Sequence, residues 1–150
     1  MSCCVMPPIF HVQIRLGVGG TIEVPMKTQG EIEAAICKGL SRFELGQMGR
    51  GPEDVHAYLI NDLLVVRLQG VLTAAEQHLA TSSPSEKGRD LLKQMRVQLF
   101  ETARPVMEKM VQESTGAKVV SLHHDISTVT GEEVVLFTLA GPPLFRETRK

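Results

Sequence analysis

The amino-acid sequence predicts an α+β domain with two layers, in which two hairpins form a four-stranded antiparallel sheet and helices pack on one face. Three observations lead to this fold class. Helix starts are marked by capping boxes, and two pairs of apolar segments flank short polar turns. The elements also follow in the order α-β-β-α-α-β-β, so each hairpin comes after helical sequence. A chain of 150 residues is long enough for one core.

The first predicted helix begins after Thr28. Thr28 and Glu31 fit a capping box, in which the hydroxyl and the carboxylate each accept a hydrogen bond from a backbone N–H of the first turn. The pattern ends at the glycine-rich segment 46–52. The apolar side chains that share one face of this helix are Ile32, Ile36, Leu40 and Phe43.

The first predicted hairpin joins segments 55–60 and 63–71 through Asn61 and Asp62. A two-residue polar turn fixes the register of the strands on either side. It sets Tyr58 opposite Val65 and His56 opposite Arg67.

A short helix and a long helix are predicted next. Thr73 and Ser83 open two further capping boxes, and Gly116 ends the apolar stripe of the long helix. Pro105 is expected to kink or divide that helix, because proline removes a backbone hydrogen bond. The members of the stripe are Leu92, Met95, Leu99, Ala103, Val106, Met107 and Met110.

The second predicted hairpin joins segments 118–129 and 132–141 through Thr130 and Gly131. A two-residue turn here sets Asp125 opposite Leu136 and His124 opposite Phe137. Strand alternation places the adjacent residues His123 and His124 on opposite faces of the sheet, so they cannot both bind one metal ion without a bulge.

His124 is expected to be a buried core histidine. It shares its row with Val120, Leu122 and Ile126, which are predicted to face the helices.

The outer face of the sheet carries the polar constellation of the chain. If the hairpins lie side by side, His56, Tyr58, Arg67, His123 and Asp125 converge there. One interpretation is a ligand site: a weak metal site, or an anion site built on arginine. The other, which we favour, is an Arg67–Asp125 ion pair within a subunit interface, because large exposed apolar faces are rare on monomers. The apolar residues of this face are Ile60, Leu63, Val65, Val134 and Leu136.

Other candidate sites are weaker. Arg50 lies among flexible glycines, where it could reach an anion or a partner. The predicted ligand-binding residues are therefore Arg67, Asp125, His123, His56 and Arg50. No catalytic residues, metal site or cofactor are predicted.

Composition limits the function classes. Sixteen basic and seventeen acidic residues give a formal charge of -1, which offers no electrostatic argument for nucleic acid or for an anionic membrane. No apolar run approaches the roughly 20 residues that span a bilayer. Cys3, Cys4 and Cys37 form neither a disulfide framework nor a CxxC pair, which suits a soluble protein of the reducing cytoplasm.

The domain organisation is predicted in three parts. Residues 1–25 form an N-terminal extension, which is either an extra strand or a mobile segment upstream of a natural start at Met26. We favour the second interpretation. Residues 26–141 form the single α+β domain, and residues 142–150 are a C-terminal tail.

Four segments of the chain resemble the MpsC-like family of small bacterial proteins. They are "GRGP" at 49–52, "LLVVRLQGVLTAAE" at 63–76, "LFETARPVMEKMVQESTGAKVVS" at 99–121 and "HDISTVTGEEVVLFTL" at 124–139. The resemblance runs from Thr28 to Leu139 and supports a natural start at Met26. The positions that carry it are Gly49, Arg50, Gly51, Pro52, Arg67, Gly70, Thr73, Glu76, Arg104, Pro105, Asp125, Ser127, Thr128 and Gly131.

The resemblance implies a role rather than a reaction. The family name refers to a sodium-translocating system that generates a membrane potential, with this family as a soluble component. The hypothesis is a non-enzymatic cytoplasmic homodimer that acts as the partner or regulator of a membrane ion-transport system. The alternative is a small-ligand, anion or metal-binding domain, or an enzyme, that uses the outer sheet face.

Overall fold

A computed structural model describes residues 11–16, 20–82 and 85–147 of the chain. The predicted fold class and element order are confirmed, and a further hairpin precedes them. The strands are β1 (His11–Leu16), β2 (Gly20–Pro25), β3 (Asp54–Ile60), β4 (Leu63–Gln69), β5 (Val119–Ile126) and β6 (Glu133–Leu139). The helices are α1 (Gln29–Met48), α2 (Ala74–Thr81) and α3 (Ser85–Thr115).

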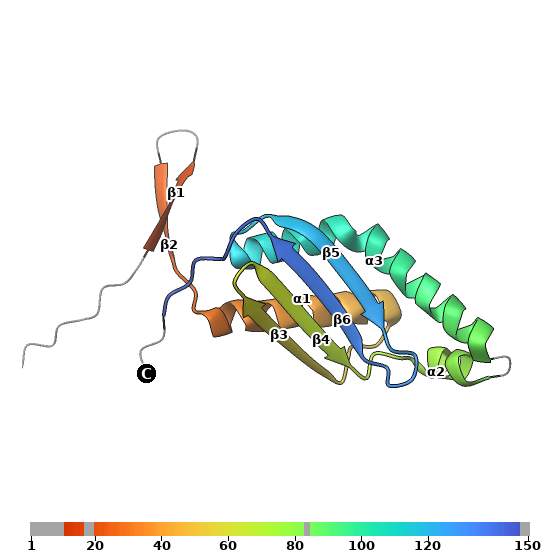
Figure 1. Cartoon of the computed structure of the whole chain (residues 1–150). Coiled ribbons are helices and arrows are strands. Elements are labelled where there is room, and N and C mark those ends of the chain that lie inside the picture. The colour runs from red at the N-terminus through yellow and green to blue at the C-terminus, as the bar shows by residue number, and fades with distance from the viewer. Residues whose placement is uncertain (1–10, 17–19, 83–84, 148–150) are drawn as a thin grey trace, which may run out of the picture.

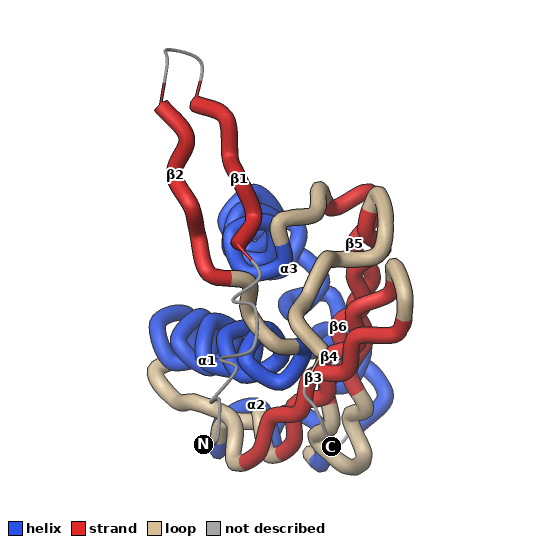
Figure 2. The backbone as a smooth tube through the Cα atoms, turned by 90° about the vertical axis from the view of Figure 1, so that its left-hand side faces the viewer, coloured by secondary structure: helices blue, strands red, loops and turns tan. Residues whose placement is uncertain are grey.

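The main sheet has the strand order β3-β4-β6-β5, and every neighbouring pair is antiparallel. The predicted hairpins therefore lie side by side through β4 and β6. α1 and α3 cover one face of this sheet, with α1 against β3 and α3 against β5 (Figure 1). The view along the layers separates these helices from the sheet, whose other face carries no helix among the described elements (Figure 2).

The core lies between the helices and the inner sheet face. Alternate residues of β3, β4 and β6 point inward, as the period of a strand requires. The largest fully buried apolar side chains are Phe100, Phe137, Ile32, Ile36, Leu40, Leu64, Leu68, Leu92, Met107 and Leu139.

The helix ends follow from local chemistry. Thr28 and Thr73 both form complete capping boxes, with Glu31 and Glu76 respectively. Gly49 ends α1 in the left-handed region, with φ of 72°, which glycine adopts without steric cost. The box predicted at Ser83 lies outside the described residues.

Two expectations about the long helix have different outcomes. Gly116 follows its last residue with φ of 75°, as expected for a helix stop. Pro105 does not divide the helix, which is continuous from Ser85 to Thr115.

The first hairpin has the predicted register. Tyr58 pairs with Val65 and His56 with Arg67. Asn61 in the turn has φ of 55°, a conformation that asparagine tolerates better than most residues. The two-residue turn therefore determined the alignment of β3 and β4.

The register predicted for the second hairpin is wrong by two residues. His123, not Asp125, pairs with Leu136, and His124 pairs with Val135. The reason is the connection: β5 ends at Ile126 and β6 begins at Glu133, so a six-residue loop replaces the expected two-residue turn. Within this loop the N–H of Gly131 donates to the carbonyl of Ser127.

A register irregularity between Val119 and Ser121 corrects one core assignment. Val119 is buried, whereas Val120 is 62% exposed and does not share the inner row with Leu122. A bulge inserts one extra residue into a strand, which reverses the side-chain alternation on one side of it.

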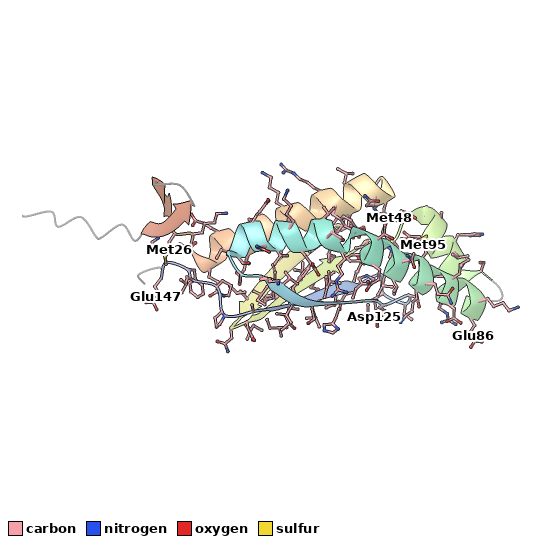
Figure 3. The ribbon with its side chains drawn as sticks, turned by 90° about the horizontal axis from the view of Figure 1, so that it is seen from above. Met26, Met48, Glu86, Met95, Asp125 and Glu147 are labelled. Carbon is pink, nitrogen blue, oxygen red and sulfur yellow. The ribbon has the colours of Figure 1, made fainter. Side chains whose placement is uncertain are left out.

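The terminal segments lie near each other at one end of the domain. β1 and β2 pair only with each other and extend away from the main sheet (Figures 1 and 2). Near the other terminus, the N–H of Arg146 donates to the carbonyl of Lys27, and Phe145 packs against the core. Met26 and Glu147 accordingly lie at the same end of the molecule (Figure 3).

Candidate functional site

The outer face of the main sheet is built from three rows of side chains that cross all four strands. The pairing of β3 with β4, β4 with β6 and β6 with β5 determines each row. The rows are Ile60, Leu63, Thr138 and Ser121; Tyr58, Val65, Leu136 and His123; and His56, Arg67, Val134 and Asp125.

The middle of this face is apolar. Leu63, Val65 and Leu136 lie on the central strands. They are only half-buried, because nothing among the described elements covers them. On the outer strand β3, Tyr58 is 48% exposed and Ile60 is 57% exposed. These partly exposed side chains form a continuous apolar surface, which we call the outer face patch: Tyr58, Ile60, Leu63, Val65 and Leu136.

The structure does not bring the predicted polar residues together. His56 lies on β3 and His123 and Asp125 lie on β5, and these are the two edge strands of the sheet. Three strand spacings of about 4.8 Å separate the edges by about 14 Å. A single metal ion cannot be bound by side chains that start so far apart.

Each of these groups has a neighbour of its own. His56 Nε2 lies 2.9 Å from Asp54 Oδ2, on the same strand. Arg67 donates from Nε to Glu132 at 2.8 Å, rather than to Asp125 as expected. Glu132 directly precedes β6, the strand that pairs with β4, whereas β6 itself separates Arg67 from Asp125 on β5.

Asp125 pairs with the helical layer. Its carboxylate lies 3.2 Å from Lys93 Nζ on α3 and accepts a hydrogen bond from the N–H of Ile126. The hydrogen bond from Ile126 and the nearby Lys93 charge lower the pKa of Asp125. His123 is exposed at the same edge.

Arg50 is engaged within the fold. Its guanidinium donates to the carbonyl of Leu72 at 3.0 Å and to Glu53 at 3.0 Å. The residue after α1 is thereby tied to the segment between β4 and α2. These internal contacts account for the arginine among the glycines, and no external anion is needed to explain it.

A second polar group, absent from the sequence-based predictions, lies inside the core. Arg96 of α3 is completely buried and contacts three buried glutamates. Its Nε and one terminal nitrogen bind Glu76 at 2.8 and 3.0 Å in a two-pronged geometry. Its other terminal nitrogen lies 3.1 Å from both Glu44 and Glu133. With His124 these residues form what we call the Arg96 cluster.

The Arg96 cluster shifts the protonation of its members in different directions. Burial and the neighbouring Glu133 charge raise the pKa of Glu44 to about 8. Burial opposes the charge of Glu76, but its hydrogen bonds from Arg96 and Thr73 lower the pKa of that carboxyl. Burial alone would lower the pKa of Arg96, yet Glu76 and the other two carboxylates raise it.

His124 is a buried member of this cluster, as its predicted core position implied. Its Nε2 lies 2.7 Å from Glu133 Oε1, and its side chain is 4% exposed. The ring stacks on Phe100 with centroids 3.9 Å apart. Among the described residues, His124 Nδ1 and Glu133 Oε2 are buried without a hydrogen-bond partner.

The sequence contained a signal for the Arg96 cluster. Glu44 continues the series Ile32, Ile36 and Leu40, with each member four residues after the last. Arg96 occupies the same spacing between Leu92 and Phe100. A charged residue that continues a buried helical row needs a buried partner of opposite charge. Only the fold, however, brings the two rows together.

The chemistry available to these groups is limited. Within the described ranges, no set of three or more His, Cys, Asp or Glu side chains is arranged to hold a metal ion. Cys37 is partly buried and its thiol donates to the carbonyl of Val55, and burial raises its pKa. A thiol of raised pKa is a poor nucleophile. No helix in the described part of the chain is both long and apolar enough to cross a membrane.

Fold and surface together define a small α+β domain with one open sheet face and a buried charged cluster. The family model described as "Na+-translocating membrane potential-generating system (MpsC)" matches residues 28–141. The chain belongs to this MpsC family.

Two curated relatives come from Bacillus subtilis (strain 168). The uncharacterized protein YbcI is 35% identical over 113 residues, which are 75% of this chain and 89% of the relative. The uncharacterized protein YrhF is 32% identical over 91 residues, 59% of this chain and 71% of the relative. No solved structure matches the chain significantly.

Proposed function

We propose that the protein is a non-enzymatic cytoplasmic component that dimerises through the outer face patch and acts as the partner or regulator of a membrane ion-transport system. The family description supports the link to a membrane-potential system. The observation that carries the proposal is the apolar sheet face that no described element covers.

The size of the face allows a small dimer interface. Four strands about 4.8 Å apart and about seven residues long cover roughly 19 by 23 Å. This is the scale of the largest apolar patches on monomers, which are often functional. Side chains that stand above the sheet add accessible area, toward the roughly 800 Å² per partner of a stable interface.

The pattern of the rows suits a second copy of this chain. A two-fold axis parallel to the strands places β3 of one copy over β5 of the other, within the rotation of about 30° usual for packed sheets. Val65 then faces Leu136 of the partner subunit. At the edges, His56 faces Asp125 of the partner subunit. One symmetry operation thus brings the apolar centres of the two copies together.

The alternative, a ligand site on the same face, has less support. The edge groups that would form it lie about 14 Å apart across the sheet. Arg67, Asp125 and Arg50 each already contact a group of opposite charge within the chain. A ligand would have to displace these contacts.

The dimer is tested by measuring mass in solution with light scattering at micromolar concentration. We expect twice the 16.5 kDa of one chain for the wild type. Val65→Asp and Tyr58→Asp place a charge in the patch and should each give a monomer that keeps the far-UV circular dichroism of the wild type. Val106→Asp is the matched control, since Val106 is 66% exposed on α3 in the other layer. A monomeric wild type would refute the dimer.

The physiological role is tested in cells that lack the gene, with a potential-sensitive dye. We expect an altered membrane potential that is restored by the wild type and by Val106→Asp, but not by Val65→Asp. An unchanged membrane potential in the deletion strain would contradict the regulatory role. It would not bear on the dimer, which light scattering tests separately.

A further inference from the structure

The Arg96 cluster contains more negative than positive charge. Glu44, Glu76 and Glu133 bring three carboxyl groups, and Arg96 brings one permanent positive charge. All four side chains are at most 6% exposed. An uncompensated charge in such a place is expensive, so a buried carboxyl group takes up a proton instead.

We propose that the Arg96 cluster is a proton-binding site in which Glu44 holds one exchangeable proton beside Glu133, and that its release loosens the last turn of α1 from the sheet. This inference stands apart from the proposed dimer.

The hydrogen-bonding groups around Glu44 and Glu133 support a proton between these two residues. Glu44 and Glu133 both contact the same terminal nitrogen of Arg96 at 3.1 Å, so their carboxyl groups are neighbours. Glu133 Oε2 is buried and has no partner among the described residues. Two carboxylates are acceptors only, whereas a protonated Glu44 is a donor that can reach Glu133. The raised pKa of Glu44 is consistent with this arrangement.

Five of the described elements contribute titratable or charged groups to the site. α1 contributes Glu44, α2 contributes Glu76, α3 contributes Arg96, β6 contributes Glu133 and β5 contributes His124. The inward residues of the remaining neighbour β4 are apolar: Leu64, Val66 and Leu68. Glu76 is already neutralised by the two-pronged contact with Arg96. Glu44 and Glu133 share the other terminal nitrogen, and Glu133 alone also contacts His124 Nε2, at 2.7 Å, so Glu44 is the carboxyl group with the fewer partners.

A proton fits this site better than a metal ion. The guanidinium of Arg96 already occupies the space between the carboxylates, with nitrogens directed at all three. A second cation placed among them would be repelled by a permanent positive charge. A proton needs no additional space.

The end of α1 is the part best able to respond. Glu44 lies one turn before the last residue of α1, Met48, and the helix then ends at Gly49. Residues 45–47 are exposed, so Glu44 is the last fully buried residue of α1. When the proton leaves Glu44, its carboxylate and that of Glu133 repel each other, and an outward movement of this turn lets Glu44 reach water.

The test compares unfolding free energy with pH in the wild type and in Glu44→Gln, whose amide imitates the protonated acid. The folded pKa of about 8 is above the ordinary 4.5, so the folded state holds one proton more between these values and wild-type stability falls as pH rises. From pH 6 to 7 we expect the unfolding constant to increase about tenfold more in the wild type than in Glu44→Gln, and this difference in slope should decrease as the pH approaches 8. Glu113→Gln, at an exposed site on α3, should retain the wild-type profile. Equal slopes in the wild type and Glu44→Gln would overturn the proposal.

A second measurement on the wild type does not depend on the stability of a variant. Infrared spectra at pH 6.5 and 9.5 should show a protonated carboxyl band that is lost at the higher pH. Backbone hydrogen exchange at residues 44–49 should accelerate over the same range, beyond the general base-catalysed increase seen in other helices. Absence of the band at pH 6.5, or a selective stabilisation by sodium relative to choline, would overturn the assignment to a proton.

Discussion

Arg96→Met removes the positive charge from the centre of the core while it nearly preserves volume. In the wild type, Arg96 donates to Glu44, Glu76 and Glu133 and to the carbonyl of Val71. Methionine is flexible and fills an irregular space, so the cavity contribution should be small. The main effect is then the loss of partners for buried carboxylates.

The expected loss of stability depends on how many buried carboxylates lose their positive partner. Glu44 is largely protonated at pH 7, so two carboxylates lose their counter-charge. Hydrogen bonds to charged groups contribute about 1.5–3 kcal/mol each, and removal of one partner from a buried ion pair costs about 3–5 kcal/mol. We therefore expect a loss of about 3–5 kcal/mol, a large part of the roughly 5–15 kcal/mol typical of a domain.

The assay is equilibrium unfolding in urea, which is uncharged, followed by far-UV circular dichroism at pH 7 and pH 5. Arg104→Met is the matched control, because Arg104 pairs with Glu108 on the solvent side of the same helix. Without Arg96 the folded-state pKa values of the carboxyl groups rise, so the deficit of Arg96→Met should shrink at pH 5. A midpoint for Arg96→Met equal to that of Arg104→Met would refute this account of the core.

Two further predictions concern glycines and a helix cap. Gly88→Ala should destabilise the protein by about 1–3 kcal/mol, because a Cβ there would lie 2.0 Å from the carbonyl oxygen of Leu79. Gly46→Ala is the control, because a Cβ at Gly46 would meet nothing within 4 Å. Alanine there should stabilise α1 by about 0.5–1 kcal/mol. Equal changes in melting temperature for the two variants would contradict the argument. Thr73→Ala should lower the free energy of unfolding by about 1 kcal/mol, because α2 loses its N-cap. Chemical denaturation measures this change, and an unchanged midpoint would count against the role of the cap.

The hairpins illustrate how far local sequence determines register. Asn61 and Asp62 form a two-residue turn, and the alignment of β3 with β4 was predicted correctly. Segment 127–132 turns through six residues, so counting outward from Thr130 and Gly131 placed the strands two residues out of register. A short turn permits few geometries, whereas a longer loop permits many that sequence patterns do not distinguish.

The expected site on the outer face depended on an arrangement that sequence does not contain. Alternation correctly placed His123 and Asp125 on one face and His124 on the other. Their separation from His56 follows from the strand order, in which β3 and β5 are the two edges. Strand order is decided by pairing between distant segments, here β4 with β6.

Local sequence patterns were enough to predict the fold class, the order of the helices and strands, the capping of α1 and α2, and the apolar character of the outer face. These features arise from interactions between residues a few positions apart, or from the period of a single element. The meeting of Glu44, Glu76, Arg96, His124 and Glu133, in contrast, depends on how the elements pack. Each comes from a different element, and a charge becomes tolerable in a core only where the packing of several elements supplies its partners.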